Sequence, residues 1–145
     1  MVDRATLERK IFFIHERVRK LKILQQRDKV TFLSDFEAVD ATKYNLQVTI
    51  EAIIDAATHI VAREKWGIPA TSADAVKSLQ AHGIIDETLL LNTLQMIKFR
   101  NRIVHLYQEV DDGQIYDILQ SGIADIENFV AQIGRQLPGF AMTSL

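Results

Sequence analysis

The sequence predicts an all-α fold, an antiparallel up-and-down four-helix bundle with one extra short helix, in a single domain over residues 1–145. Apolar residues recur every three or four positions through most of the chain, which is the spacing of the buried face of a helix. The two prolines, Pro69 and Pro138, fall where that pattern is interrupted. No segment alternates polar and apolar residues as a half-buried strand does. Four long periodic segments joined by short connections favour antiparallel neighbours.

The first helix is predicted to run from Asp3, whose carboxylate can cap it, to about Gln26. Its inward stripe consists of Ile11, Ile14, Val18, Leu21 and Leu24. Residues 28–30 are expected to form a short link. Thr31 is then expected to cap a short helical turn that ends at Phe36.

A long second helix is predicted to follow and to end at about Lys65. Its inward residues, at spacings of three and four, are Leu46, Ile50, Ile53, Ile54, Ala57 and Ile60 or Val61. The sequence Trp66-Gly67-Ile68-Pro69 predicts its end, because Gly67 suits a left-handed C-terminal cap and Pro69 cannot continue a helix.

A short helix is predicted in the longest crossover, capped by Thr71 or Ser72 and running to about His82, where Gly83 closes it. Asp86 is expected to cap the next long helix. Its inward residues are Leu90, Leu94 and Ile97.

Asp112-Gly113 is expected to be a turn, and the last helix is predicted from about Gln114 to Gln136. Its inward residues are Ile115, Ile118, Leu119, Ile123, Ile126, Phe129, Val130 and Ile133. Leu137-Pro138-Gly139 is expected to stop it.

The composition is that of a soluble globular protein, with 48% hydrophobic and 25% charged residues. The absence of cysteine excludes disulfides and cysteine-ligated zinc. No apolar run approaches the roughly 20 residues that span a bilayer, and the N-terminus lacks the basic start and apolar core of a signal peptide. We therefore expect a cytoplasmic protein with no membrane partner.

The charge is unevenly distributed. Residues 1–30 hold nine Lys/Arg and four Asp/Glu, a net of +5, so the remainder carries −7 of the total of −2. A basic first helix can lie beside residues 100–102 and form a local positive surface with them. Alternatively, its cations are a solvated helix face. The small total charge argues against a protein that coats nucleic acid nonspecifically.

The stretch from Arg100 to Tyr107 places a cation, an acid/base group and a phenol in the arrangement R-x4-H-x-Y within this apolar pattern. At about 100° per residue, Arg100 lies between Met96 and Val104 in the middle of the apolar stripe, where a Leu is expected. Tyr107 lies almost directly above it. An unpaired buried guanidinium is costly, so such an Arg normally faces a partner or a cleft.

His105 is the second part of this pattern. It lies about 140° around the helix and about 7.5 Å along its axis from Arg100. In one straight helix these two side chains cannot bind the same small group, so either the helix bends near residue 105 or a second protein chain completes the site. The amide of Asn101, one turn before His105, can orient the imidazole, and Arg102 adds positive charge on the side opposite to Arg100.

Known cofactor and metal motifs are absent. The sequence has neither G-x-x-x-x-G-K-[ST] nor G-x-G-x-x-G, and it lacks H-E-x-x-H and the paired E-x-x-H of di-iron bundles. His15, His59 and His82 have no matching carboxylates at ligand spacing. We therefore expect neither a cofactor nor a metal.

The motif and its context resemble HepT-type HEPN proteins, the toxin half of HepT–MntA toxin–antitoxin systems. The likeness covers most of the chain, including residues 44–60, the break at 66–69 and the motif at 99–107. It implies a helical homodimer that cleaves RNA without a metal, with Arg100 and His105 as catalytic residues. It also implies that a partner MntA-type nucleotidyltransferase adenylylates Tyr107 and thereby silences the toxin.

The implied chemistry fits these residues. RNA is cleaved when its 2′-hydroxyl attacks the adjacent phosphate; an imidazole can transfer the proton, and a guanidinium can stabilise the added negative charge. Two copies of the motif across a dimer axis would remove the geometric difficulty of the separated side chains. Two alternatives remain. One is a non-catalytic helical module that binds a nucleotide or a nucleotidyltransferase, and the other is a structural dimer in which Arg100 forms an interface ion pair.

Overall fold

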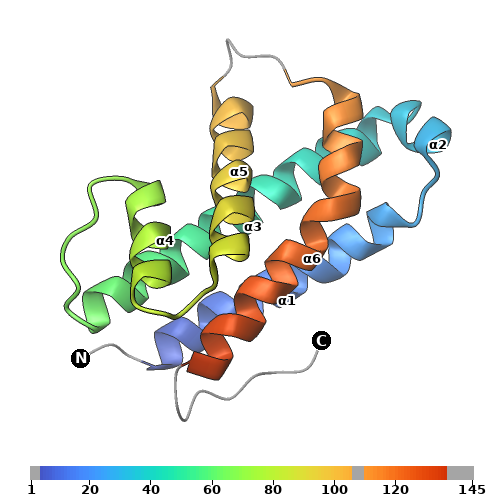
Figure 1. Ribbon diagram of the computed structural model, residues 1–145. Helices are drawn as coiled ribbons and strands as arrows, with labels where there is room; N and C mark the ends of the chain where they lie inside the picture. The colour runs from blue at the N-terminus through green and yellow to red at the C-terminus, as the bar shows by residue number, and fades with distance from the viewer. Residues whose placement is uncertain (1–3, 106–109, 137–145) are drawn as a thin grey trace.

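The computed structural model describes residues 4–105 and 110–136, and in this part of the chain every regular element is a helix (Figure 1). The all-α prediction is therefore confirmed. The helices are α1 (Arg4–Gln25), α2 (Lys29–Leu33), α3 (Phe36–Arg63), α4 (Ser72–Ala81), α5 (Glu87–Val104) and α6 (Asp112–Gln136). The predicted cap Asp3 and the predicted stop at 137–139 lie outside the described residues.

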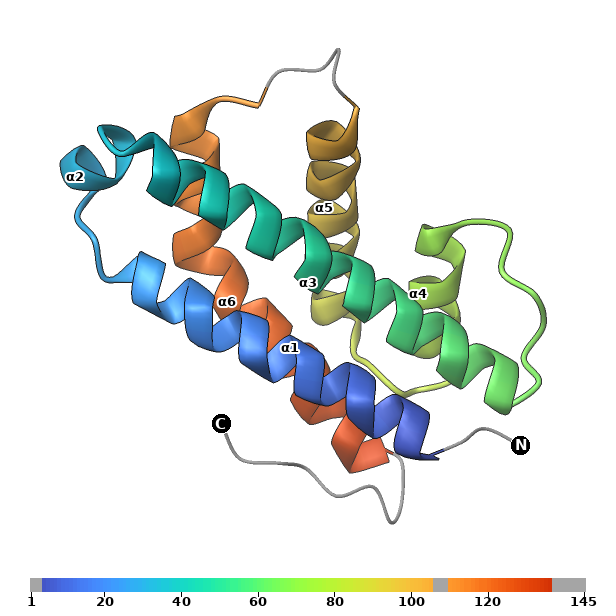
Figure 2. The same ribbon diagram turned by 180° about the vertical axis from the view of Figure 1, so that it is seen from behind.

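The four long helices pack around one apolar core. Antiparallel α1 and α3 lie side by side, α6 packs against both, and α5 packs against α3 and α6 (Figures 1 and 2). The short α4 lies in the crossover between α3 and α5 and contacts both of them, as predicted. The largest fully buried side chains include Phe32, Leu46, Ile53, Ile60, Ile115 and Phe129. Each such side chain contributes about 1.5–3 kcal/mol through removal of apolar surface from water.

The predicted inward stripes agree with the observed burial in α1 and α3, whereas in α5 Ile97 is buried but the predicted Leu90 and Leu94 are only half-buried, as is Ile118 in α6. In α1, the residues Leu7, Ile11, Ile14, Val18 and Leu21 are buried, whereas Leu24 is half-buried. In α3, every residue of the predicted stripe is buried. The periodic placement of apolar residues therefore determines which side of each helix faces the core.

The start of α2 corrects one prediction. Its N-cap is Asp28, whose Oδ1 accepts a hydrogen bond from the Thr31 amide at 2.8 Å, so Thr31 lies inside the helix. Phe36 begins α3 instead of ending the short turn, because the Asp35 carboxylate caps α3 by accepting from the amides of Glu37 and Ala38. An aspartate caps as well as a threonine does and adds a favourable charge at a helix N-terminus.

The end of α3 corrects a second prediction. The left-handed residue at the cap is Lys65, with φ 59°, and not Gly67. The Lys65 amide donates to the carbonyl of Ala62 and the Trp66 amide donates to that of Val61, at 3.2 and 3.0 Å, which is the Schellman pattern. Gly67 also has positive φ, 109°, but it lies in the loop beyond the cap.

The end of α4 agrees with prediction. His82 is the C-cap and Gly83 adopts a left-handed φ of 75°. The His82 ring stacks on the indole of Trp66, with ring centroids 3.8 Å apart and planes inclined by 4°. The stack joins the C-terminal end of α4 to the segment that leaves α3.

The start of α6 corrects a third prediction. The helix begins at Asp112, so Asp112-Gly113 forms its first turn and not a separate turn. The Asp111 carbonyl accepts hydrogen bonds from the amides of Gln114 and Ile115 at 2.9 and 3.1 Å. An acidic residue in the first turn of a helix interacts favourably with the helix dipole, which offsets the cost of Gly113.

None of the described helices combines the length and the apolarity that a bilayer crossing requires.

Acidification is predicted to destabilise the fold through His15, a buried residue of α1. Burial lowers the pKa of His15, and the charges of Glu127 and Glu16 oppose this only in part. Because its pKa is lower in the folded chain, the unfolded chain takes up the proton first. The free energy of unfolding should therefore fall as pH drops below about 6.5. Urea unfolding across this range should show a steeper loss for the wild type than for His15→Gln, and equal slopes would contradict the prediction.

Candidate active site

α5, which carries the R-x4-H segment, is attached to α6 along its length. Three pairs of polar side chains join them: Asp86 with Gln132, Asn92 with Asp125, and Arg102 with Gln114. The donor–acceptor distances are 2.8 Å for both bonds of the first pair, 3.0 Å for the second and 3.1 Å for the third. Since α5 and α6 are antiparallel, the pairs fix both the register and the rotation of α5.

Another side of α5 is apolar and packs against the core, where Leu89, Met96, Ile97 and Phe99 are buried. Arg100 lies among these positions and is itself half-buried, as the wheel predicts. Its Nε atom is buried and has no hydrogen-bond partner among the described residues. The Arg100 guanidinium forms no ion pair within this part of the chain, so a half-buried cation has no counterion among the described residues.

The two arginines of the motif have different surroundings. Arg102 Nη2 donates to Gln114 Oε1, so Arg102 is on the α6 side of α5. Two residues correspond to about 200° of helix, which places Arg100 on the side of α5 turned away from Gln114. The predicted supporting role of Arg102 is thus accompanied by a structural one, since it connects the C-terminal end of α5 to the first turn of α6.

His105 lies where α5 ends. It is the C-cap, with an extended backbone (φ −91°, ψ 103°), and its amide donates to the Asn101 carbonyl at 3.2 Å. The His105 side chain is exposed. The chain therefore leaves the helix at the residue where the sequence requires either a bend or a second chain. The His105 amide still forms the helical hydrogen bond to Asn101, so the end of the helix does not by itself bring the His105 side chain to the side of Arg100.

The remaining predicted site residues are placed as follows. Asn101 is exposed, and its described bond to His105 runs through its backbone carbonyl. Tyr107, the predicted modification site, lies outside the described residues. In the segments 4–105 and 110–136, no three His, Cys, Asp or Glu side chains gather as metal ligands would.

The basic first helix does not border the motif within one chain. Among the described residues, α1 contacts α3 and α6 but has no contact with α5. The expectation that α1 and residues 100–102 form one positive surface is therefore wrong for a single chain. Arg19, Lys20 and Lys22 are exposed, in agreement with the alternative of a solvated helix face, whereas Arg17 is half-buried.

Known proteins share both the sequence pattern and the fold. The family model described as "Ribonuclease HepT-like" matches residues 14–133. The chain is 35% identical to an mRNA nuclease HepT of Shewanella oneidensis over 114 residues, which cover 77% of this chain and 86% of the relative. It is 26% identical to a tRNA nuclease HepT of Aphanizomenon flos-aquae over 136 residues, which cover 94% and 92%. A solved structure of a tri-AMPylated Shewanella oneidensis HEPN toxin in complex with an MNT antitoxin superposes with a TM-score of 0.83 at 32% identity, covering 92% of this chain and 98% of the other.

Replacement of Arg100 by Met is predicted to stabilise the fold. Met keeps an unbranched chain of similar length and removes a buried N–H that lacks an acceptor, an unmet group that costs about 1–3 kcal/mol. We expect the free energy of unfolding from urea titration to rise by about 1 kcal/mol. The matched control Lys98→Met, on the exposed side of α5, should change it by no more than about 0.5 kcal/mol. A clear loss of stability in Arg100→Met would show that the guanidinium has a stabilising partner in solution.

Proposed function

Because this chain belongs to the ribonuclease HepT-like family, we propose that it is the toxin of a toxin–antitoxin pair and acts as a metal-independent endoribonuclease. The two relatives named as mRNA and tRNA nucleases support RNA as the substrate. The solved toxin–antitoxin complex supports a minimal nucleotidyltransferase of the MntA type as the partner. In this proposal Arg100 and His105 are the catalytic residues, and Asn101 and Arg102 support them.

The observation that carries the proposal is the guanidinium of Arg100, which has no ion pair within residues 4–105 and 110–136. Among the described residues, this half-buried cation has no partner for its buried Nε, an arrangement that costs free energy and that is found where such a group binds an anion. The phosphate of RNA is an anion of suitable geometry, and a guanidinium can donate two parallel hydrogen bonds to it. Arg100 would stabilise the negative charge that builds up on the phosphate in the transition state.

His105 supplies the proton transfer in this proposal. Its exposed side chain, at the end of α5, is accessible to a large substrate. One imidazole takes the proton of the 2′-hydroxyl as that oxygen attacks the phosphorus, and the bond to the 5′-oxygen breaks. A second imidazole gives a proton to the departing 5′-oxygen. The products are a 2′,3′-cyclic phosphate and a free 5′-hydroxyl, and no metal ion is needed to balance the reaction.

We place the complete site at a homodimer interface. One chain offers one Arg100 and one His105, whereas the reaction above uses an acid and a base. A two-fold axis near the C-terminal ends of two α5 helices would bring both copies of each group to one phosphate. The rigid attachment of α5 to α6 supports this arrangement, since it holds the end of α5 in a fixed position for the partner subunit.

The first test of this function is RNA cleavage by purified protein in the presence of EDTA. Loss of the acid/base group in His105→Ala should lower the cleavage rate by about 10²–10⁴-fold. Loss of the cation in Arg100→Ala should lower it by about 10²–10³-fold. Lys98→Ala removes a nearby exposed cation outside the motif and should cleave like the wild type. Equal cleavage by all four proteins would refute the proposal.

The shared site is tested by mixing wild-type chains with the inactive His105→Ala variant. Wild-type chains and an excess of His105→Ala chains form mixed dimers that contain a single imidazole, so one of the two proton transfers has no group to carry it. Cleavage per wild-type chain should therefore fall steeply as His105→Ala is added. If each chain has a separate site, cleavage per wild-type chain should not change.

Silencing is predicted to occur at Tyr107. The partner nucleotidyltransferase and ATP should transfer AMP to its phenol oxygen, with pyrophosphate leaving, and the added phosphate and bulk would block the anion site near Arg100. Intact-mass spectrometry should show AMP on the wild type and on the control Tyr44→Phe, together with loss of RNA cleavage. Tyr107→Phe should remain unmodified and active. Modification without any RNA cleavage by the unmodified protein would favour the non-catalytic binding module instead.

A further inference from the structure

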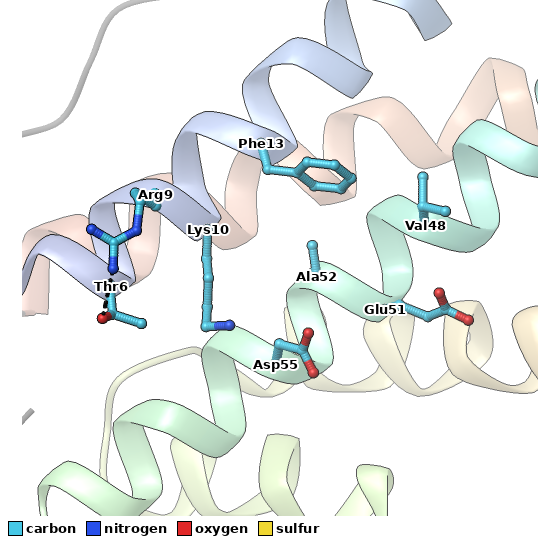
Figure 3. A pocket seen from close by; sticks show the side chains of 8 residues that line it. All are labelled: Thr6, Arg9, Lys10, Phe13, Val48, Glu51, Ala52 and Asp55. Atoms are coloured by element: carbon cyan, nitrogen blue, oxygen red, sulfur yellow. Dashed lines mark hydrogen bonds between the residues drawn. The ribbon is translucent and has the colours of Figure 1, made fainter. Parts of the chain in front are cut away.

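The outer face formed by α1 and α3 is hollowed and carries exposed aromatic side chains. A groove of 410 Å³ lies between the two helices, with Phe13 and Val48 in its lining (Figure 3). A second groove, of 760 Å³, continues along α1 and shares Arg9 and Phe13 with the first. Phe12, Phe13 and Tyr44 are 59%, 38% and 57% exposed. Aromatic side chains exposed together along a groove are typical of an interaction surface.

The two helices of this face carry opposite charge. α1 holds seven Lys/Arg and two Glu, a formal charge of +5. α3 holds four Asp/Glu and two Lys/Arg, a formal charge of −2. The two helices lie side by side in the view of Figure 2, and where they line the first groove α1 contributes Arg9 and Lys10 and α3 contributes Glu51 and Asp55, so the face is basic on one side of the groove and acidic on the other. RNA is negatively charged and would be repelled by the acidic half of this face. A second copy of the same face, turned over, would instead place its acidic half on the basic half of the first copy and its basic half on the acidic half.

Arg17 lies at the junction of the two halves, and no carboxylate within residues 4–105 and 110–136 forms an ion pair with it. Its Nη1 donates to Asn45 Oδ1 at 3.1 Å, and its guanidinium carbon is 5.0 Å from the Phe13 ring centroid and 5.8 Å from that of Tyr44. Its Nε is buried, with no hydrogen-bond partner among the described residues. An arginine between two partly exposed aromatic rings is the composition of an interface hot spot.

We infer that this face binds a second copy of the chain, with α1 of each copy lying on α3 of the other. The two-fold axis would run along the seam between α1 and α3. Rotation about such an axis does not move a residue along the seam. A residue of α1 in one copy therefore faces, in the other copy, the same α3 residues that lie beside it in its own chain. Arg9 shares a groove with Glu51 and Asp55, and it would therefore meet these two carboxylates of the other copy. The alternative of α1 on α1 would place a helix of charge +5 on another of the same charge.

This contact is distinct from the dimer of the proposed catalytic site. α5 and α1 lie on opposite sides of α3 in the two views, and no contact joins them among the described residues (Figures 1 and 2). A chain with two different self-complementary faces links its dimers into larger assemblies, either closed or open. The inference therefore goes beyond the proposed function, and neither depends on the other.

Paired charge reversals test the contact in the full-length protein. The basic-helix variant is Arg9→Glu/Lys10→Glu, and the acidic-helix variant is Glu51→Lys/Asp55→Lys. Each variant alone sets like charges against each other, so its mass from light scattering after size exclusion should fall at least about two-fold below that of the wild type. An equimolar mixture of the two should return to the wild-type mass, because each reversed α1 then meets a reversed α3 on another chain.

The control variant has the same change in net charge, but at residues outside the proposed interface. Lys65→Glu/Lys77→Glu changes the charge by the same amount as the basic-helix variant, on exposed residues outside the face, and should keep the wild-type mass. Circular dichroism checks that every variant remains helical. The inference is overturned if both variants keep the wild-type mass, or if their mixture stays at the lower mass. It is also overturned if the variants lose only binding to RNA or to the antitoxin. The molar mass is measured without RNA cleavage, so this test gives the same answer whether or not the proposed function is correct.

Discussion

The placement of the R-x4-H segment depends on how α5 is held between two kinds of contact. Buried apolar side chains of α5 pack toward the core, and three polar pairs along another side attach the same helix to α6. A shift of α5 by one turn would break all three pairs and would expose Met96 and Phe99. The position of His105 is therefore determined by contacts distributed over all 18 residues of the helix, most of them distant from the reacting groups. This arrangement permits an unfavourable residue, Arg100, to remain in the apolar stripe without displacing the helix.

The helices and the core could be predicted because a period of three to four residues directly reports which side of a helix is buried. The predicted caps at Thr71, His82 and Asp86 are confirmed, whereas the errors at Thr31, Gly67 and Asp112-Gly113 share one cause. At each end, several neighbouring residues are able to cap, and packing of the whole chain decides which one does. At the site, the anomalous position of Arg100 was predictable and is confirmed by its burial. A bend near residue 105 was one of two alternatives, and the sequence could not choose between them because neither Gly nor Pro marks the end of the helix. The Gln114 partner of Arg102 was not predictable because it depends on tertiary register. The catalytic roles and Tyr107 remain predictions.

Net charge alone describes this molecule poorly. The total of −2 is the sum of a strongly basic α1, an acidic α3 and a motif rich in cations at the end of α5. α1 and α3 lie side by side on one face, whereas the motif is on α5, which does not contact α1 among the described residues, so the face and the motif can interact with different classes of partner. A protein of nearly neutral overall charge can then bind an anion at one place and a copy of itself at another without general affinity for nucleic acid.

The stacked pair of Trp66 and His82 has a practical consequence. Trp66 is the sole tryptophan of the chain. Its fluorescence therefore reports on the junction between the end of α3 and the end of α4, and it is insensitive to the distant end of α5. Far-ultraviolet dichroism, in contrast, averages over all helices. Coincident melting by the two signals would mean that the crossover unfolds together with the bundle, whereas an early fluorescence change would identify α4 as a separate, weaker cooperative unit.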